Sequence, residues 1–117
     1  MLKVVFHINE LNKWEMTLGN IKNLFKDAGQ EKSQVSLVAN GEAVRIITMA
    51  KKDKAASAIL YDIKILSSKN VKMFFCHNAL RGNDIETSIV PEYIEVVPAG
   101  ITKLIYLQQN GCAYIKP

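Results

Sequence analysis

Cys76, His77 and Asn78 follow one another at the end of an apolar run, and each carries a side chain that can take part in chemistry. The run itself, residues 71–75, is interrupted only by Lys72 and predicts a buried strand. A thiol at the end of such a strand lies at the border of the core, where a substrate can reach it. If a helix begins directly after Cys76, its first amides point toward the sulfur and favour the thiolate. The thiolate is the form that reacts in thiol exchange.

The alternative interpretation of Cys76 is packing, because a free cysteine often serves as a small buried apolar side chain. Its position and its neighbours do not separate the two interpretations. His77 is a weak candidate for a base, since adjacent side chains on a strand point to opposite faces. His7, near the end of another apolar run, is better placed if its strand lies beside that of Cys76. Cys112 begins the last apolar run, and we interpret it as packing.

Cysteine and histidine are too few for the common structural sites. The chain has two cysteines and two histidines, with no CxxC pair. Two cysteines do not make a disulfide framework, and this set does not match a structural zinc site. We therefore expect no metal and no cofactor.

Hydrophobic periodicity predicts alternating strands and helices. Apolar runs rich in β-branched residues predict strands, and apolar residues spaced by three and four predict helices. The expected strands cover residues 2–8, 33–39, 70–76, 94–98 and 112–116, and the main expected helices cover 11–28, 53–66 and 98–111, with shorter ones at 42–49 and 78–82. This alternation is typical of an α/β fold with a mostly parallel sheet, and the short last strand is expected at its edge. At 117 residues without a linker, the chain is expected to form a single domain over residues 1–117.

The carboxyl ends of these strands bring the polar candidates to one side of the sheet. In open parallel sheets, ligands bind in the crevice beyond those ends. The residues expected there are His7 after the first strand, Asn40 and Gly41 after the second, Cys76 to Asn78 after the third, and Gly100 after the fourth.

Composition and charge argue against several functional classes. The net charge is +4, but the lysines are scattered and no basic stripe carries interleaved aromatic residues, so direct nucleic-acid binding is not expected. The densest basic stretch, KKDK at 51–54, is interpreted as a solvated helix start, with an anion-binding patch as the alternative. No apolar stretch reaches membrane-spanning length and no secretory signal is recognisable, which predicts a cytoplasmic protein.

Common enzyme motifs do not occur in the sequence. It contains no GxGxxG and no GxxxxGK[ST], so a standard dinucleotide or triphosphate site is not expected. None of its serines lies in a GxSxG setting, which argues against a hydrolase of that type.

Several segments together resemble a known family. They are KVVFHI at 3–8 followed by a helix with Trp14, ANGEAV at 39–44, FFCHNAL at 74–80, VPAGITKLIYLQQNG at 97–111 and CAYIKP at the end. In their order and spacing they resemble the DsrE/DsrF-like proteins, including the sulfur-relay proteins of the YchN and TusD type.

The resemblance implies both a fold and a chemistry. It implies a three-layer sandwich, with a five-stranded sheet and helices on both faces, assembled into trimers or hexamers. It implies that Cys76 occupies the position of a sulfur-carrying cysteine that holds a persulfide. Asn40, Gly41 and Asn78 match positions of the pocket, and His7 matches a strand-end position.

Two functional hypotheses follow. In the first, the chain is a sulfur carrier or sulfurtransferase that takes sulfane sulfur on Cys76 from a donor protein and passes it to an acceptor protein. In the second, it is a non-catalytic oligomeric module whose pocket, lined by Asn40, Gly41 and Gly100, binds a small anion or a nucleotide-like ligand. The apolar segment 88–97 is a candidate for the subunit contact, unless it folds onto its own core.

Overall fold

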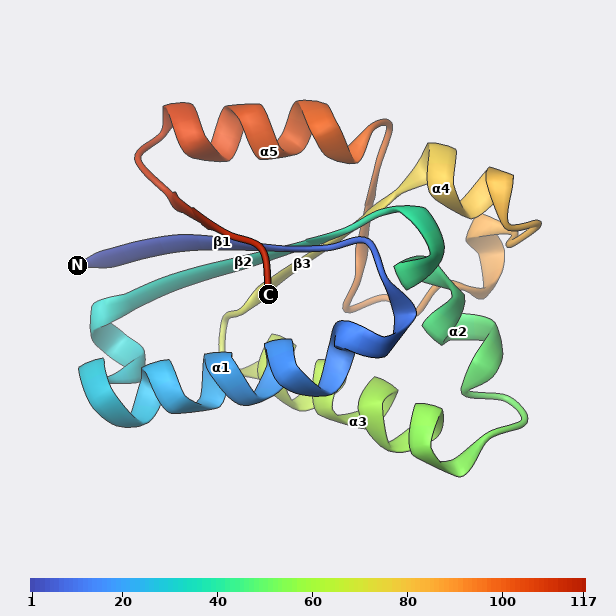
Figure 1. The fold of residues 1–117 in the computed structure, drawn as a ribbon, viewed down its shortest axis with the longest axis horizontal. Coiled ribbons are helices and arrows are strands. Elements are labelled where there is room, and N and C mark those ends of the chain that lie inside the picture. Colours follow the sequence, from blue (N-terminus) through green and yellow to red (C-terminus); the bar gives the residue numbers. More distant parts are fainter.

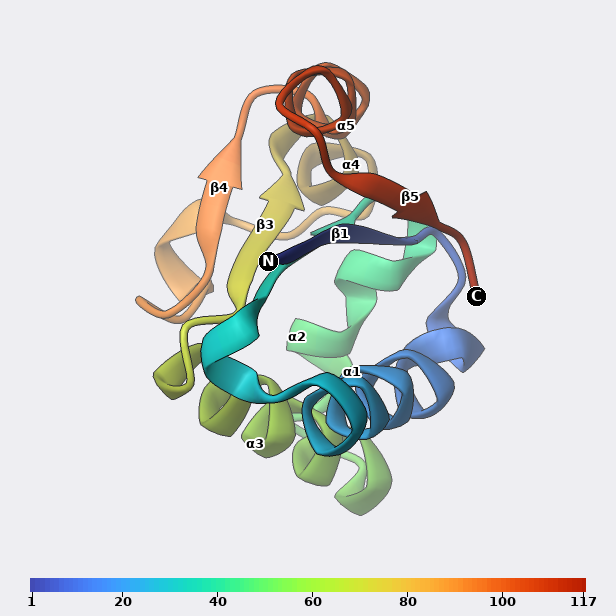
Figure 2. The same cartoon turned by 90° about the vertical axis from the view of Figure 1, so that its left-hand side faces the viewer.

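Five strands form a single parallel sheet in this computed structural model, which describes residues 1–117. The order across the sheet is β4-β3-β2-β1-β5, and every pairing is parallel (Figures 1 and 2). The last strand lies at an edge, as its length and position predicted. The strands are β1 (Leu2–Ile8), β2 (Ser33–Ala39), β3 (Lys72–Cys76), β4 (Glu95–Val97) and β5 (Ala113–Ile115).

Helices connect the strands and make the fold α/β, as expected. The three long ones are α1 (Trp14–Ala28), α3 (Lys54–Ser68) and α5 (Gly100–Gln109), and the short ones are α2 (Ile46–Met49) and α4 (His77–Gly82). Single 3₁₀ turns cover Leu11–Lys13, Gln30–Lys32, Gly41–Arg45 and Thr87–Ile89. None of these helices combines the length and the apolar character that crossing a bilayer requires.

The direction of the connections explains why helices cover both faces of the sheet. β1, β2, β3 and β4 follow one another across the sheet in one direction, whereas the chain returns from β4 to β5 in the opposite direction. Crossovers between parallel strands are right-handed, so a reversal of direction moves the connecting helix to the other face. Accordingly α1 and α3 lie on one face and α5 lies on the other (Figure 1). The result is the three-layer arrangement that the family resemblance implied.

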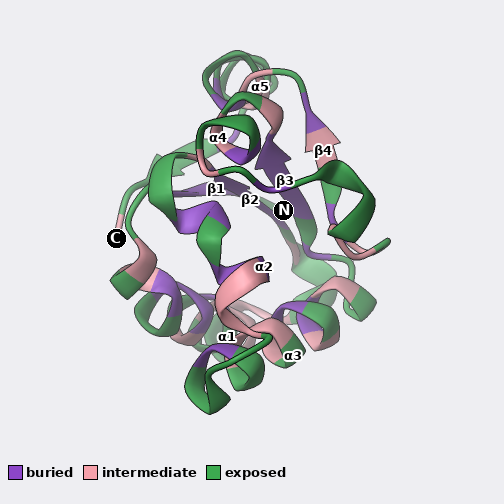
Figure 3. Cartoon of the chain, turned by 90° about the vertical axis from the view of Figure 1, so that its right-hand side faces the viewer, coloured by how far each residue is buried: buried purple, intermediate pink, exposed green.

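The two faces hold cores of different size. The face of the sheet that α1 and α3 cover buries a cluster of 22 residues, whereas the face that α5 covers buries a cluster of six. Trp14 anchors the larger cluster, because its ring stacks on Phe75 and its indole N–H donates to the Ala43 carbonyl at 2.9 Å. Ala43 belongs to the turn after β2, so this bond fixes the segment that follows the strand. The inner strands are buried between the layers, while the outer helix surfaces are exposed (Figure 3).

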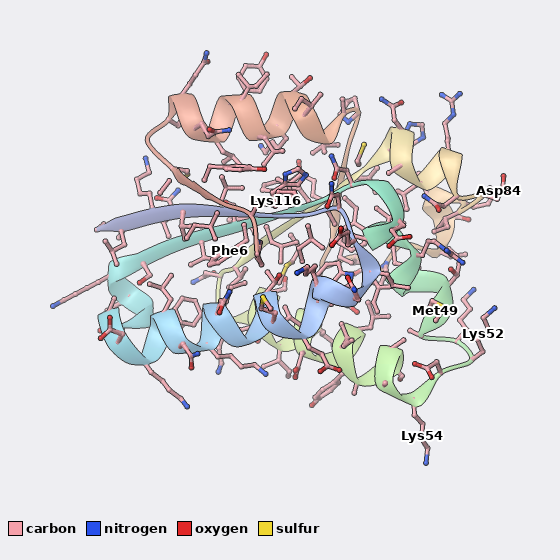
Figure 4. All side chains as sticks on the ribbon, in the orientation of Figure 1. Phe6, Met49, Lys52, Lys54, Asp84 and Lys116 are labelled. Atoms are coloured by element: carbon pink, nitrogen blue, oxygen red, sulfur yellow. The ribbon has the colours of Figure 1, made fainter.

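Two local expectations are settled by the packing. In KKDK, the Asp53 carboxylate caps α3 by accepting from the Ala56 N–H at 2.9 Å, and the side chains of Lys52 and Lys54 project into solvent (Figure 4). The stretch is therefore a solvated helix start. In segment 88–97, Ile94 is buried and its neighbours pack against the larger core, so this segment folds largely onto its own domain.

Candidate functional site

Cys76 is the last residue of β3 and the N-cap of α4. Its backbone is still extended (φ −75°, ψ 121°), and the helix begins at the next residue, His77. The Sγ atom accepts a hydrogen bond from the Ala79 N–H at 3.4 Å. The Ala79 amide is one of the first N–H groups of the helix, which have no partner within the helix itself, and the sulfur supplies that partner. The strand-to-helix junction expected after Cys76 is present.

Cys112 provides an internal comparison. The two thiols are equally hidden, with 6% of Cys76 and 7% of Cys112 exposed. Cys112 packs into the smaller core beside Val5 and Leu104, and it precedes β5, so no helix begins after it. Only Cys76 has an amide directed at its sulfur.

Asn40 is the neighbour of Cys76 on the next strand. Ala39 pairs with Phe75 in the register of β2 and β3, so the following residues, Asn40 and Cys76, lie side by side. Asn40 is still extended (φ −137°, ψ −172°), and its N–H donates to the Ile8 carbonyl at 3.0 Å. The sheet geometry therefore extends one residue beyond β2 and places the Asn40 side chain on the face of the sheet that α5 covers.

His7 contacts Asn40 rather than Cys76. The His7 Nε2 lies 2.9 Å from Asn40 Oδ1, and its Nδ1 lies 2.6 Å from the Tyr114 hydroxyl. Because β2 separates β1 from β3, His7 is one strand too far away to take a proton from Cys76 directly. The sequence-based condition that its strand be next to that of Cys76 is not met.

Gly100 packs between Asn40 and Cys76. A Cβ added to it would lie 3.3 Å from the Cβ atoms of both residues and from Val38 Cγ1. Gly100 is the first residue of α5, and the N-cap residue Ala99 supplies no side-chain hydrogen bond to the helix. The first turn of α5 thus stands over the ends of β2 and β3 with its leading amides uncapped by any side chain.

Gly41 shapes the turn after β2 and is not a contact of Cys76. Its φ is +54°, and a Cβ on it would meet the Asn9 carbonyl oxygen at 3.0 Å. Its own carbonyl accepts a hydrogen bond from the Asn83 side-chain amide at 3.2 Å, which ties the turn to the end of α4. Gly41 therefore holds the loop that presents Asn40.

No hydrogen bond joins the side chain of His77 or Asn78 to the Cys76 sulfur. Asn78 is exposed in the first turn of α4 and makes no hydrogen bond within the chain. His77 lines a surface cavity of about 380 Å³ together with Arg81 and Asp84, and Cys76 does not line this cavity. No three His, Cys, Asp or Glu side chains come together as a set of metal ligands.

Sequence reasoning missed two members of the site. Ala79 contributes only its backbone amide, which no residue-type pattern reveals, although its position three residues after an N-cap is a usable signal. Tyr114 contacts His7 because β5 pairs with β1 through Val5 and Tyr114. The contact between His7 and Tyr114 joins residues 107 positions apart in the chain, and local periodicity contains no information about it.

Comparisons with known proteins agree with this architecture. A model of the DsrE/DsrF-like family matches residues 5–117. The structure is similar to that of MTH1491, a protein of unknown function from Methanobacterium thermoautotrophicum, with 24% identity, full coverage of both chains and a TM-score of 0.81. It is also similar to the YchN protein from E. coli, with 17% identity, full coverage of both chains and a TM-score of 0.74. A search of curated protein sequences found no match. At these identities the two structures show a shared fold.

Proposed function

Because the chain belongs to the DsrE/DsrF-like family, as its sequence indicated, we propose that it is a sulfur carrier that holds sulfane sulfur on Cys76 as a persulfide. The observation that carries the proposal is the Ala79 N–H directed at Cys76 Sγ from the first turn of α4. The family resemblance implies a sulfur relay, and this contact supports the proposal because it gives the sulfur of Cys76 a hydrogen-bond donor.

The proposed reaction is a pair of thiol exchanges. The Cys76 thiolate attacks the outer sulfur of a donor persulfide, a new S–S bond forms, and the donor leaves as a thiolate. An acceptor thiolate then attacks the outer sulfur on Cys76, and Cys76 leaves as a thiolate. The sulfane sulfur keeps its oxidation state throughout, so neither step needs an oxidant or a reductant. With an acceptor present the chain acts as a sulfurtransferase, and without one it is a carrier.

The hidden position of Cys76 restricts how the donor arrives. Only 6% of the residue is exposed, so the donor must present a narrow terminal sulfur rather than a bulky disulfide. The same burial shields a persulfide from oxidants, which attack exposed and thiolate-rich cysteines first. We place this carrier in the cytoplasm, where thiols stay reduced, and we expect donor and acceptor proteins as its partners.

A second candidate function is the non-catalytic binding of a small anion. It is supported by the first turn of α5, whose N-cap Ala99 gives no side-chain hydrogen bond and whose Gly100 packs beside Asn40. Uncapped helix amides of this kind bind anions in many proteins. In this case Cys76→Ser retains full ligand affinity, whereas in the carrier Cys76→Ser abolishes the function.

Intact-protein mass spectrometry after incubation with glutathione persulfide or thiosulfate tests the carrier directly. We expect the wild type to gain the mass of one sulfur atom and to lose it on treatment with a reductant. Cys112→Ser is the matched control, since Cys112 is as buried as Cys76 but lacks the helix amide. It is expected to load normally, whereas Cys76→Ser gains nothing. Loading that follows Cys112, or a wild type that stays unmodified with both donors, would refute the proposal.

We also propose that the chain forms a homo-oligomer, with a trimer or hexamer as the expected size. The support comes from α5, which exposes Ile101, Ile105 and Tyr106 on its outer surface. Contiguous apolar side chains on a surface are typical of protein interfaces. This surface begins next to Gly100, so a subunit docked on it would lie close to the Cys76 site.

A further inference from the structure

Four neighbouring strands each contribute one residue to a row across the sheet. Cys76 ends β3, Asn40 follows β2, His7 lies in β1 and Tyr114 lies in β5, which is the spatial order of these strands. Hydrogen bonds join Tyr114 to His7 and His7 to Asn40. The proposed sulfur carrier requires only Cys76, so the other three members of the row call for an explanation of their own.

The row fixes the direction of its hydrogen bonds. Asn40 Oδ1 can only accept, so His7 Nε2 must carry the proton and donate to it. The Nδ1 of a neutral imidazole is then an acceptor, and the Tyr114 hydroxyl donates to it at 2.6 Å. The Asn40 oxygen thus sets the Nε2–H tautomer of His7, the Tyr114 hydroxyl satisfies the remaining Nδ1, and the two bonds hold the His7 ring with its N–H on the Asn40 carbonyl oxygen.

A carbonyl oxygen turned toward β1 leaves the Asn40 NH₂ group turned away from β1, on the side of β3 and α5. This nitrogen makes no hydrogen bond within the chain, and Asn40 is only half-buried, so the group is free to donate to a bound molecule. Asn40 and Cys76 lie on either side of Gly100, each with its Cβ 3.3 Å from the position of a Gly100 Cβ. An NH₂ group on this side is therefore a neighbour of whatever is bound to the sulfur.

Several hydrogen-bond donors lie near Cys76. They are the Ala79 N–H, the Asn40 NH₂ and the uncapped first amides of α5, which begins at Gly100. We propose that this set selects sulfane donors whose transferable group is anionic, such as a persulfide anion or thiosulfate. Asn40 is the specificity residue, and His7 and Tyr114 are positioning residues that keep its NH₂ group turned to the site. The inference rests on the proposed function, because it concerns the molecule that Cys76 attacks.

Asn40→Asp is the most direct test, since it keeps the oxygen that accepts from His7 but replaces the NH₂ donor with a negative charge. Two reagents are compared: thiosulfate, which is anionic and leaves sulfite after transferring its sulfane sulfur, and methyl methanethiosulfonate, which is neutral and leaves methanesulfinate. Both consume the thiolate, so the ratio of their rates is independent of how much thiolate is present. We expect the ratio of thiosulfate to neutral reagent to fall about tenfold or more, the loss typical of a charge-assisted hydrogen bond.

The positioning residues are tested by conservative rescue. His7→Gln retains an N–H that can donate to Asn40 Oδ1, whereas His7→Phe keeps the size of the ring without a donor. We expect the rate ratio of His7→Gln to stay within about threefold of wild type and that of His7→Phe to fall as in Asn40→Asp. Nitrogen-15 NMR of His7 provides a readout independent of reaction, with the Nε2–H tautomer expected in the wild type. Finding the Nδ1–H tautomer would overturn the inference, because the Asn40 amide would then present its oxygen to the site.

Failure of the inference is distinguishable from failure of the carrier function. If the wild type gains sulfur on Cys76 but Asn40→Asp leaves the rate ratio unchanged, the carrier stands and the inference is wrong. If Cys76 gains no sulfur, binding is followed instead with thiosulfate added to Cys76→Ser. A shift of the Asn40 side-chain amide signals, with no shift of those of the exposed Asn20 on α1, would then support anion selection without transfer. No shift at Asn40 would refute it.

Discussion

Gly100 lies against Cys76 with little room for a side chain, since a Cβ on Gly100 would stand 3.3 Å from the Cβ of Cys76. The same Cβ would also stand 3.3 Å from Asn40 and from Val38. All three neighbours are carbon atoms at or near the backbone of two paired strands, so none can swing aside as a flexible side-chain end could. A methyl group at this position would therefore be tightly packed between the start of α5 and the ends of β2 and β3.

Gly100→Ala is therefore expected to push α5 away from the sheet. Overpacking of this kind typically costs about 1–3 kcal/mol, and the better helix propensity of alanine offsets up to about 1 kcal/mol of it. We expect a net loss of roughly 1–2 kcal/mol in the free energy of unfolding in urea. The reaction rate of Cys76 with methyl methanethiosulfonate is expected to rise, because the displaced helix uncovers the thiol.

The control for this substitution is Gly19→Ala in the middle of α1. Nothing lies within 4 Å of a Cβ at Gly19, and its backbone is helical. We expect it to stabilise the protein by up to about 1 kcal/mol through helix propensity alone. Equal effects of the two substitutions would contradict the close contact at Gly100.

The N-cap role of Cys76 predicts different outcomes for its two simplest replacements. Serine retains a side-chain acceptor for the Ala79 N–H, whereas alanine leaves that amide without its partner. We expect Cys76→Ala to be less stable than Cys76→Ser by about 1 kcal/mol in urea unfolding. Identical stabilities would show that the sulfur does not accept this hydrogen bond, and the proposed function would lose the observation that carries it.

Trp14 couples the larger core to the loop that presents Asn40. Trp14→Phe removes the indole N–H, so the buried Ala43 carbonyl keeps only the Ile46 N–H as a donor. We expect a loss of about 2–4 kcal/mol from the missing hydrogen bond and the reduced ring volume. Circular dichroism is the appropriate probe, since Trp14 is the only tryptophan. Met16→Ala, at an exposed position of the same helix, is expected to change stability by less than about 0.5 kcal/mol.

Tyr93 predicts a loss of stability at alkaline pH. Burial disfavours the phenolate and raises the pKa of Tyr93 above its usual value of 10.0. Because the folded state holds the proton more tightly than the unfolded chain, this contribution is complete below pH 10 and is lost as the pH rises through the folded pKa. Urea unfolding of wild type and Tyr93→Phe between pH 8 and about pH 11 checks this. A difference between the two proteins that does not change with pH would contradict it.

Much of the fold follows from local sequence patterns. Apolar runs and helical periodicity indicated all five strands and the long helices, and the alternation of the two indicated a parallel sheet. Because parallel strands end at one edge, Cys76, Asn40 and His7 were expected near one another. The resemblance of the chain to the DsrE/DsrF-like family depended on the segments that contain these residues, and the family model confirms it.

Other features of the site depend on strand order, which local patterns do not contain. Whether His7 lies beside Cys76 is decided by β2, which intervenes between their strands. Tyr114 reaches His7 only because the last strand returns across the whole sheet to pair with β1. Asn78 was expected in the site because of its spacing from Cys76, but the helical turn between them directs the Ala79 amide, not the Asn78 side chain, to the sulfur.

The exposed surface of α5 predicts the state of assembly. Ile101 and Ile105 are one helical turn apart, and 62% and 48% of their surfaces are exposed. Burying such side chains between subunits contributes about 1.5–3 kcal/mol each, so replacing both with serine should dissociate a homo-oligomer. We expect light scattering to give a mass of three or six times 13.1 kDa for the wild type and a smaller mass for the double variant, with unchanged circular dichroism. Tyr61→Ser, equally exposed on α3 across the sheet, is expected to leave the mass unchanged. A wild type that is monomeric at micromolar concentration would rule out this interface, and with it any contribution of a second subunit to the Cys76 site.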